Sequence, residues 1–111
     1  MLRRTRASMI HVIANIELQP GQRAAFLKEY GQLLPKIRGE RGCLEYVPAV
    51  DAATNVPLQA PPRPDVITVV EKWADLAALE AHLSAPHVGE FLARHQKAIA
   101  KVSLQILESA V

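Results

Sequence analysis

The chain has 111 residues, of which 50% are hydrophobic and 5% aromatic, and its formal net charge is +2. This length allows one domain with one hydrophobic core and excludes two. The single cysteine excludes an intrachain disulfide, and no run of apolar residues approaches the ~18 that a membrane span needs, so we expect a cytoplasmic protein. Three of the first six residues are arginines. We expect residues 1–8 to be a disordered extension and residues 9–111 to form the domain.

The first half of the chain predicts a strand, a helix and a second strand. Residues 10–18 carry apolar side chains at every even position, which is the period of a strand. Between residues 26 and 37 apolar side chains recur every three or four positions, which predicts one buried face of a helix. Pro35 lies in this stretch and should kink or shorten the helix. Residues 44–47 are typical of a second strand.

The second half predicts a loop, two strands and two short helices. Residues 51–64 contain four prolines and no periodicity, which indicates a long loop of the kind that often carries function. The β-branched run 66–73 predicts a strand, and the alternation at 102–106 predicts the last one. Asp75 can cap one helix and Pro86 can begin the next. The side chains expected to face inward are Leu76, Leu79 and Leu83 on the first helix and Val88, Phe91, Leu92, His95, Ile99 and Val102 along the second.

The resulting order, β-α-β-β-α-α-β, predicts an α+β domain of the ferredoxin-like class. If the two short helices act as one broken crossover, the order is a split βαβ pattern, with a four-stranded antiparallel sheet and helices on one face. The even-numbered face of residues 10–18 is apolar throughout. Because such a surface is unfavourable in water, we infer that the sheets of two copies meet face to face in a homodimer.

Several common catalytic arrangements are absent from the sequence. There is no GxGxxG or phosphate-binding loop, and no histidine has Asp or Glu two residues later, as a non-haem iron site would require locally. His82 and His87 are poorly spaced for a shared metal, and Cys43 lacks the setting of a nucleophile. We therefore expect no bound metal or cofactor.

Two strands carry polar residues that could have a function. Asn15 interrupts the first strand, where its amide could orient a phenol, hold an oxyanion or only satisfy the strand. Glu71 and Trp73 share the face of Val69 on the third strand. A carboxylate there is costly unless it is paired, hydrated or useful, whereas a tryptophan at that position is more often part of the core.

The four histidines lie in different settings. His82 borders the leucine-rich face of its helix, where an imidazole could reach a cleft. His87 follows Pro86 and could cap the helix or contact a ligand. His95 falls on an apolar stripe, which indicates a hydrogen-bonded core residue, and His11 is expected on the surface of its strand.

Five short motifs occur in a characteristic order: Pro20-Gly21-Gln22, Gly42-Cys43-Leu44-Glu45-Tyr46, Glu71-Lys72-Trp73, Leu79-Glu80-Ala81-His82-Leu83 and Ala85-Pro86-His87. This series resembles the antibiotic biosynthesis monooxygenase family over residues 9–108. Within the family the chain is most similar to the quinol monooxygenase branch, through residues 46–51, Gln59 in the long loop and Pro64-Asp65.

The resemblance implies a homodimer with an apolar pocket between sheet and helices. It also implies oxidation of quinols or phenols by dioxygen without a cofactor. Haem-degrading relatives carry an Asn that Asn15 matches, but their Trp falls at His82 and their His near Leu92. Because two of these three positions differ, haem degradation is set aside.

Oxygen chemistry of this kind needs a base for the hydroxyl, donors that hold the anion, and an apolar cavity. We expect His82 to be the base, because an unperturbed imidazole has a pKa of about 6.5. Asn15 would hold the oxyanion, and Glu71 would orient the imidazole or the substrate. The side chains expected to contact the substrate are Tyr46, Trp73, His87 and Phe91.

Two other functions stay open. One is an isomerase or degradative enzyme for a small signalling or carbonyl metabolite, which would use the same base. The other is a non-catalytic dimeric binder of small molecules. Oxygen uptake would separate the monooxygenase from both, and neither nucleic acid nor a membrane is an expected partner.

Overall fold

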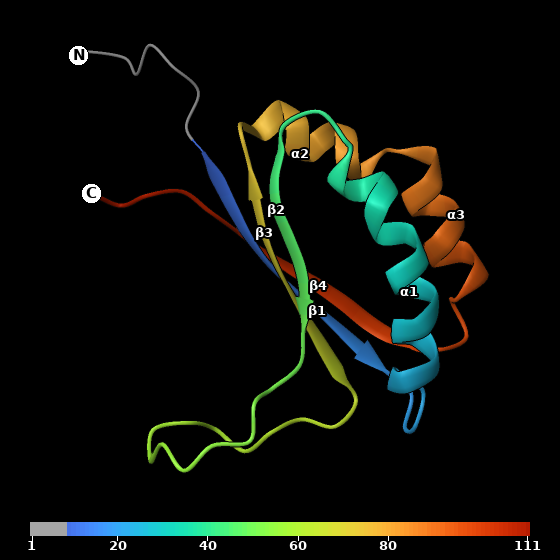
Figure 1. Cartoon of the computed structure of the whole chain (residues 1–111), viewed down its shortest axis with the longest axis vertical. Helices are drawn as coiled ribbons and strands as arrows, with labels where there is room; N and C mark the ends of the chain where they lie inside the picture. The colour runs from blue at the N-terminus through green and yellow to red at the C-terminus, as the bar shows by residue number, and fades with distance from the viewer. Residues whose placement is uncertain (1–8) are drawn as a thin grey trace.

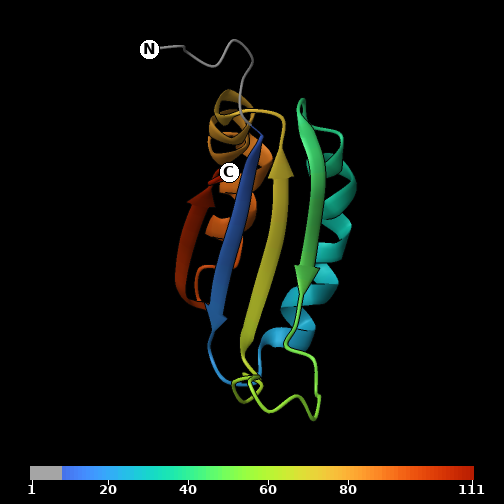
Figure 2. The same ribbon diagram turned by 90° about the vertical axis from the view of Figure 1, so that its left-hand side faces the viewer.

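The computed structural model describes residues 9–111, so the expectation for residues 1–8 lies outside the described part of the chain. In this part of the chain three helices lie on one side of a four-stranded antiparallel sheet whose strand order is β2-β3-β1-β4. Figure 1 shows the helices together on that side, and Figure 2 shows the strands side by side. This is the predicted α+β, ferredoxin-like arrangement. No helix within residues 9–111 is long and apolar enough to cross a membrane. In chain order the elements are β1 (Ile10–Leu18), α1 (Arg23–Arg38), β2 (Cys43–Ala49), β3 (Val66–Trp73), α2 (Leu76–Leu83), α3 (Pro86–Arg94) and β4 (Ile99–Leu107).

The period-two pattern of β1 places its even-numbered side chains under the helices. All five even positions from 10 to 18 are buried, and Val12, which lies opposite Glu71 of β3, is fully so. The prediction that this apolar face packs against a second copy is therefore wrong, because helices of the same chain cover it. The open face of the sheet carries the odd-numbered side chains of β1 instead, including Asn15.

Helix α1 buries the predicted apolar stripe, with Phe26, Tyr30 and Ile37 in the core. Pro35 lies inside the helix without ending it, so the expectation of a shortened helix is wrong. The backbone N–H of Gly39 donates to the carbonyl oxygen of Pro35 at 3.1 Å, which completes the last turn of the helix.

The turn between α1 and β2 packs directly on α2. Gly42 has a φ of +80°, a conformation that L side chains rarely adopt. A Cβ atom at this position would lie 2.5 Å from the Cβ of Ala78 in α2. Glycine is therefore needed here both for the backbone conformation and for the close approach of the turn to the helix.

Helix α2 begins as predicted, because the Asp75 carboxylate accepts a hydrogen bond at 2.8 Å from a backbone N–H in its first turn. Its eight residues bury only Leu79 and His82. Leu76 is 47% exposed, so the prediction that it faces inward is wrong, whereas Leu83 is equally exposed but borders the space between the helix and the sheet. A helix of two turns contacts the sheet along one narrow i, i+3 face, and positions 79 and 82 occupy it.

Helix α3 is shorter than its apolar pattern suggested. It ends at Arg94, and Ile99 begins β4, so Ile99 and Val102 belong to the strand and not to the helix. Phe91 is buried as predicted, whereas Leu92 is 38% exposed. The apolar positions of helix and strand follow one another closely here, and their two periods merge into one apparent stripe.

Residues 50–65 connect β2 to β3 without a helix or strand, as predicted. In Figures 1 and 2 this green-to-yellow segment extends beyond the end of the sheet and away from the helices.

Candidate active site

A mostly apolar cavity of about 80 Å³ lies between the sheet and the helices. The sheet contributes Ala14 and Ile16 of β1 and Val69 of β3, and the helices contribute side chains that include Leu33 and Phe91. Ligand sites commonly occupy such a position, but they are usually larger, at roughly 300–1,000 Å³. The enclosed space therefore suits a small ring system.

The cavity meets solvent between the α2–α3 pair and β4. Leu83, Leu92, Val102 and Leu104 all line the cavity, and each is more than a third exposed. An apolar molecule could enter here by displacing side chains that solvent already reaches. Four polar side chains interrupt the otherwise apolar lining, namely Tyr30, Tyr46, Glu71 and His82.

His82 is buried, with 4% of its surface exposed, and not at the border of the buried face as predicted. Its ring packs against Trp73 at a centroid distance of 4.7 Å and lies 5.5 Å from the ring of Tyr46. The Nδ1 atom is 2.9 Å from Oε1 of Glu40. Burial lowers the pKa of His82, and the Glu40 carboxylate partly opposes that shift.

Glu40 joins two histidines from successive helices. Its Oε1 atom pairs with His82 of α2, and its Oε2 atom lies 2.6 Å from Nε2 of His87 in α3. No pattern in the sequence selects this residue, which follows α1 at the start of the turn to β2. Its two partners are 42 and 47 positions away, so no local spacing links the three.

Glu71 is a second buried ionisable group of the cavity, and 5% of its surface is exposed. The Trp73 Nε1–H donates to its Oε1 at 2.9 Å. Burial raises the pKa of Glu71 to about 7, the Trp73 hydrogen bond opposes this, and the charge of Glu40 adds to it. At neutral pH this carboxyl group is thus able both to give and to accept a proton.

Two tyrosines complete the polar lining. The hydroxyl groups of Tyr30 and Tyr46 are hydrogen-bonded to each other in the core. Burial raises the pKa of both far above the usual value, so both stay neutral, and the pair keeps one hydroxyl hydrogen that is not used between them. Arg38 holds the backbone at Tyr46, because its guanidinium donates two hydrogen bonds, of 2.9 and 3.1 Å, to the main-chain oxygen of that residue.

The structure thus divides the predicted site residues into those that line the cavity, those that lie behind its lining, and Asn15 on the other face of the sheet. His82, Glu71, Tyr46 and Phe91 all line the cavity. Trp73 and His87 do not line it; they contact lining residues or Glu40 from behind.

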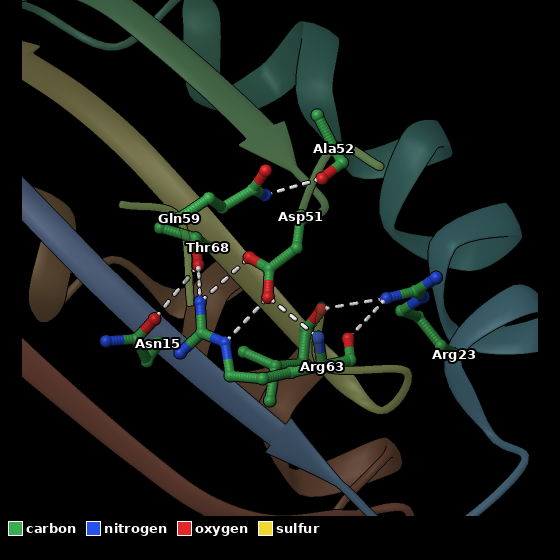
Figure 3. Close-up of polar contacts among 8 residues, drawn as sticks. Asn15, Arg23, Asp51, Ala52, Gln59, Arg63 and Thr68 are labelled. Atoms are coloured by element: carbon green, nitrogen blue, oxygen red, sulfur yellow. Dashed lines mark hydrogen bonds and ion pairs between the residues drawn. The ribbon is translucent and has the colours of Figure 1, made fainter. Parts of the chain in front are cut away.

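Asn15 lies on the opposite face of the sheet, away from the cavity. Its Oδ1 accepts from the Thr68 hydroxyl at 3.0 Å, and Arg63 donates to the same hydroxyl at 3.2 Å (Figure 3). Asp51 binds Arg63 at 2.8 Å, and these hydrogen bonds lower the pKa of Asp51 to about 2. Asn15 is therefore part of a polar network that ties the long loop to the sheet, and it does not join His82 as predicted.

The remaining candidate residues fit structural roles. His95 is half-buried and packs against Phe91 and Phe26, with ring centroids 4.4 and 5.6 Å away. Its Nε2 atom is buried without a hydrogen-bond partner in the described chain, so the expectation of a hydrogen-bonded core histidine is wrong. Burial raises the pKa of the Cys43 thiol, and nearby Glu40 reinforces the shift, so the reactive thiolate is disfavoured. Within residues 9–111 no cluster of His, Cys, Asp or Glu could hold a metal ion.

These features define a ferredoxin-like domain that encloses a small, mostly apolar site with a buried imidazole and a buried carboxyl group. Residues 9–94 match the model of the antibiotic biosynthesis monooxygenase family, and the chain belongs to this family. The predicted resemblance is thereby confirmed.

Individual relatives support this assignment. An Escherichia coli K12 protein named "Probable quinol monooxygenase YgiN" is 35% identical over 105 residues, which cover 93% of this chain and all of that protein. The solved structure of PA3566 from Pseudomonas aeruginosa is 25% identical, has a TM-score of 0.76, and is matched over 97% of this chain and 100% of its own. A conserved protein from Methanosarcina mazei Go1, 21% identical with a TM-score of 0.75 over 92% and 93% of the two chains, shares the fold.

Proposed function

We propose that this protein is a monooxygenase that oxidises a small quinol or phenol with dioxygen and without a bound cofactor. The observation that carries the proposal is the pairing of an apolar cavity with two buried groups of opposite ionisation chemistry, His82 and Glu71. The name of the E. coli relative, which the chain matches over its whole length, supports the same substrate class.

In the first step His82 acts as the general base. Its Nδ1 is committed to Glu40, which leaves Nε2 to take a proton from a substrate hydroxyl. The resulting anion is electron-rich and passes one electron to dioxygen, which gives a semiquinone and superoxide. These two radicals combine at a ring carbon and form a C–O bond, and His82 returns the proton to the peroxide.

The second step breaks the O–O bond. A base removes the proton from the same ring carbon, and the departing oxygen takes up a proton and leaves as water. For an unsubstituted ring position the sum is quinol plus O₂ to hydroxyquinone plus H₂O, in which the substrate loses four electrons and dioxygen gains them. Glu71 is the proposed proton donor, because a carboxyl group with a pKa of about 7 is partly protonated at neutral pH.

The apolar walls contribute by excluding water. Around the polar groups the cavity is lined by side chains such as Ile16, Val69 and Phe91. A dry cavity strengthens the electrostatic interactions inside it and protects reactive intermediates from side reactions. One of the Tyr30 and Tyr46 hydroxyl groups donates to the other, so the second keeps its hydrogen free and would donate it to the substrate anion, the role that the sequence predicts for Asn15.

We further propose a homodimer that forms through the open face of the sheet. Ile13, Val70 and Val47 lie in register across β1, β3 and β2 and form an apolar row on that face. Val70 and Val47 are each 40% exposed in the single chain. The neighbouring pair of Lys72 and Glu45, whose charged atoms are 3.6 Å apart, could set the register of the two copies.

The proposed function is tested by oxygen-electrode assays with one-ring and two-ring quinols. We expect equimolar consumption of quinol and O₂, and with ¹⁸O₂ one labelled atom in the product. Production of hydrogen peroxide with no label in the product would contradict the proposal, because it indicates simple oxidation. His82→Gln should lower turnover by about 10²–10⁴-fold, whereas His95→Gln, which alters an imidazole outside the cavity, should retain it.

One observation also favours a second candidate. A base and a carboxyl group with a near-neutral pKa on one cavity are suited to moving a proton within a small carbonyl compound. An isomerase of this kind would exchange substrate C–H protons with D₂O in the absence of oxygen. A non-catalytic binder would neither consume oxygen nor catalyse that exchange.

A further inference from the structure

We propose that Glu40 is the positioning residue for the His82 base, and that His87 in turn holds Glu40 in place. The inference rests on the proposed function, in which His82 accepts the proton of the substrate. It adds a residue that no sequence motif indicated and that does not line the cavity.

The geometry places the Glu40 carboxylate between two imidazoles. Its Oε1 and Oε2 atoms lie 2.9 and 3.2 Å from His82 Nδ1, and Oε2 lies 2.6 Å from His87 Nε2. Three separate segments meet at this carboxylate, namely the turn after α1, helix α2 and helix α3. The carboxylate therefore ties the helix that carries the base to the elements on either side of it.

This contact determines which nitrogen of His82 is available to a substrate. An ionised carboxylate accepts hydrogen bonds and donates none, so the Nδ1 atom of His82 must carry the hydrogen. The lone pair of the neutral ring is then on Nε2, which has no hydrogen-bond partner among the described residues. A base that faces a cavity needs this tautomer, and a carboxylate on the other nitrogen is the usual way to select it.

Burial decreases along the chain of three residues from the inside outward. The side chains of His82, Glu40 and His87 are 5%, 13% and 25% exposed, respectively. Water competes little for the inner hydrogen bond, whereas His87 lies where the solvent reaches it. His87 thus closes the outer side of the carboxylate and prevents it from rotating away from His82.

Glu40 also favours the protonated form of His82 after it has taken up the substrate proton. Burial lowers the pKa of His82, and the carboxylate is the main influence that raises it. Removal of the charge should therefore lower the pKa further and weaken the base. The titratable groups around this ring are Glu40, His87, Glu71 and Tyr46, and Cys43 lies near Glu40.

Glu40→Gln tests the proposal, because the amide has the shape of the carboxylate without its charge. Nitrogen-15 NMR of the ring nitrogens should show the Nδ1–H tautomer of His82 in the wild type and a mixture of tautomers in the variant. The pKa of His82 should fall. In steady-state assays kcat should fall about 10- to 100-fold, the range seen when a carboxylate that orients a metal-bound imidazole is removed, with KM changed less than about twofold.

Three further variants make the outcome decisive. Glu80→Gln alters an exposed carboxyl group on α2 and should change neither tautomer nor kcat. Glu40→Asp, which keeps the charge, should recover part of the lost kcat. It also serves as a folded control if Glu40→Gln is unstable. His87→Gln should lower kcat less than Glu40→Gln does.

An unchanged His82 tautomer, pKa and kcat in Glu40→Gln, while His82→Gln is inactive, would overturn the positioning role and leave the proposed function intact. A fully active His82→Gln would instead remove the proposed base, whatever the result for Glu40. The NMR arm needs no substrate and therefore separates these two failures.

Discussion

Replacement of Glu71 by Gln should make the protein more stable at alkaline pH. The folded state raises the pKa of Glu71 from 4.5 to about 7, chiefly by burial. Below pH 4.5 the group is protonated in both states and costs nothing. Between pH 4.5 and 7 the unfolded chain ionises while the folded chain holds its proton, so stability is lost as the pH rises. Above pH 7 the loss is complete, and a shift of about 2.5 pKa units corresponds to roughly 3 kcal/mol.

Glutamine at position 71 removes this cost because it does not ionise, and its amide oxygen can still accept the hydrogen bond from Trp73 Nε1. Urea unfolding of both proteins at pH 4.5 and pH 8.5 measures the effect. We expect equal stability at the lower pH and an advantage for Glu71→Gln of up to about 3 kcal/mol at the higher one. His82 is present in both proteins, so its own titration cancels. A difference in stability between the two proteins that does not depend on pH would refute the reasoning, because it would mean that folding does not raise the pKa of Glu71.

Three other outcomes are expected. His82→Gln should lower kcat by about 10²–10⁴-fold and remove the rise in rate with pH that the imidazole gives. His82→Ala should also lower the free energy of unfolding by about 2–4 kcal/mol, because it leaves a cavity beside Trp73 and an unpaired acceptor on Glu40. An alanine variant as stable as the wild type in thermal unfolding would contradict the observed burial. Light scattering should give twice the monomer mass with or without reductant, and Val70→Lys should give a monomer; a wild-type monomer at micromolar concentration would exclude the proposed dimer. Asn15→Ala should leave kcat within about twofold, since Asn15 is on the far face of the sheet, and a large loss would mean that this face contributes to the site.

The sequence predicts every helix and strand of the described chain, because apolar side chains recur with a period of two in strands and of about 3.6 in helices. The alternation in β1 and β3 even placed Glu71 and Trp73 on one face together with Val69, and all three are buried there. Period two shows that the two faces of a strand differ, but it does not show which face the helices cover. The sequence therefore predicts a second copy on the apolar face of β1, although α1, α2 and α3 of the same chain cover it. It also predicts Asn15 beside residues that lie on the other face of the sheet.

The same limit explains the other corrections around the site. Leu83 and His82 are adjacent on α2, and hydrophobicity alone favours the leucine as the buried member of the pair. The structure buries His82 instead, because Glu40 satisfies its Nδ1 and Trp73 stacks against its ring. A buried imidazole becomes acceptable only when such a partner is present. That partner comes from a turn 42 residues earlier, and one sequence carries no signal that connects the two.

One physical cause prepares both reactive groups of the proposed site. Exclusion of water disfavours whichever form is charged, so it lowers the pKa of the His82 imidazole and raises that of the Glu71 carboxyl group. The two pKa values move in opposite directions, and at neutral pH one cavity presents a neutral base and a carboxyl group that can hold a proton. Unchecked burial would weaken the base too far, and the Glu40 carboxylate counters this on the side of the ring away from the substrate. The apolar lining and the carboxylate behind His82 therefore act against each other on the same pKa, and their balance sets the pH at which the proposed reaction can run.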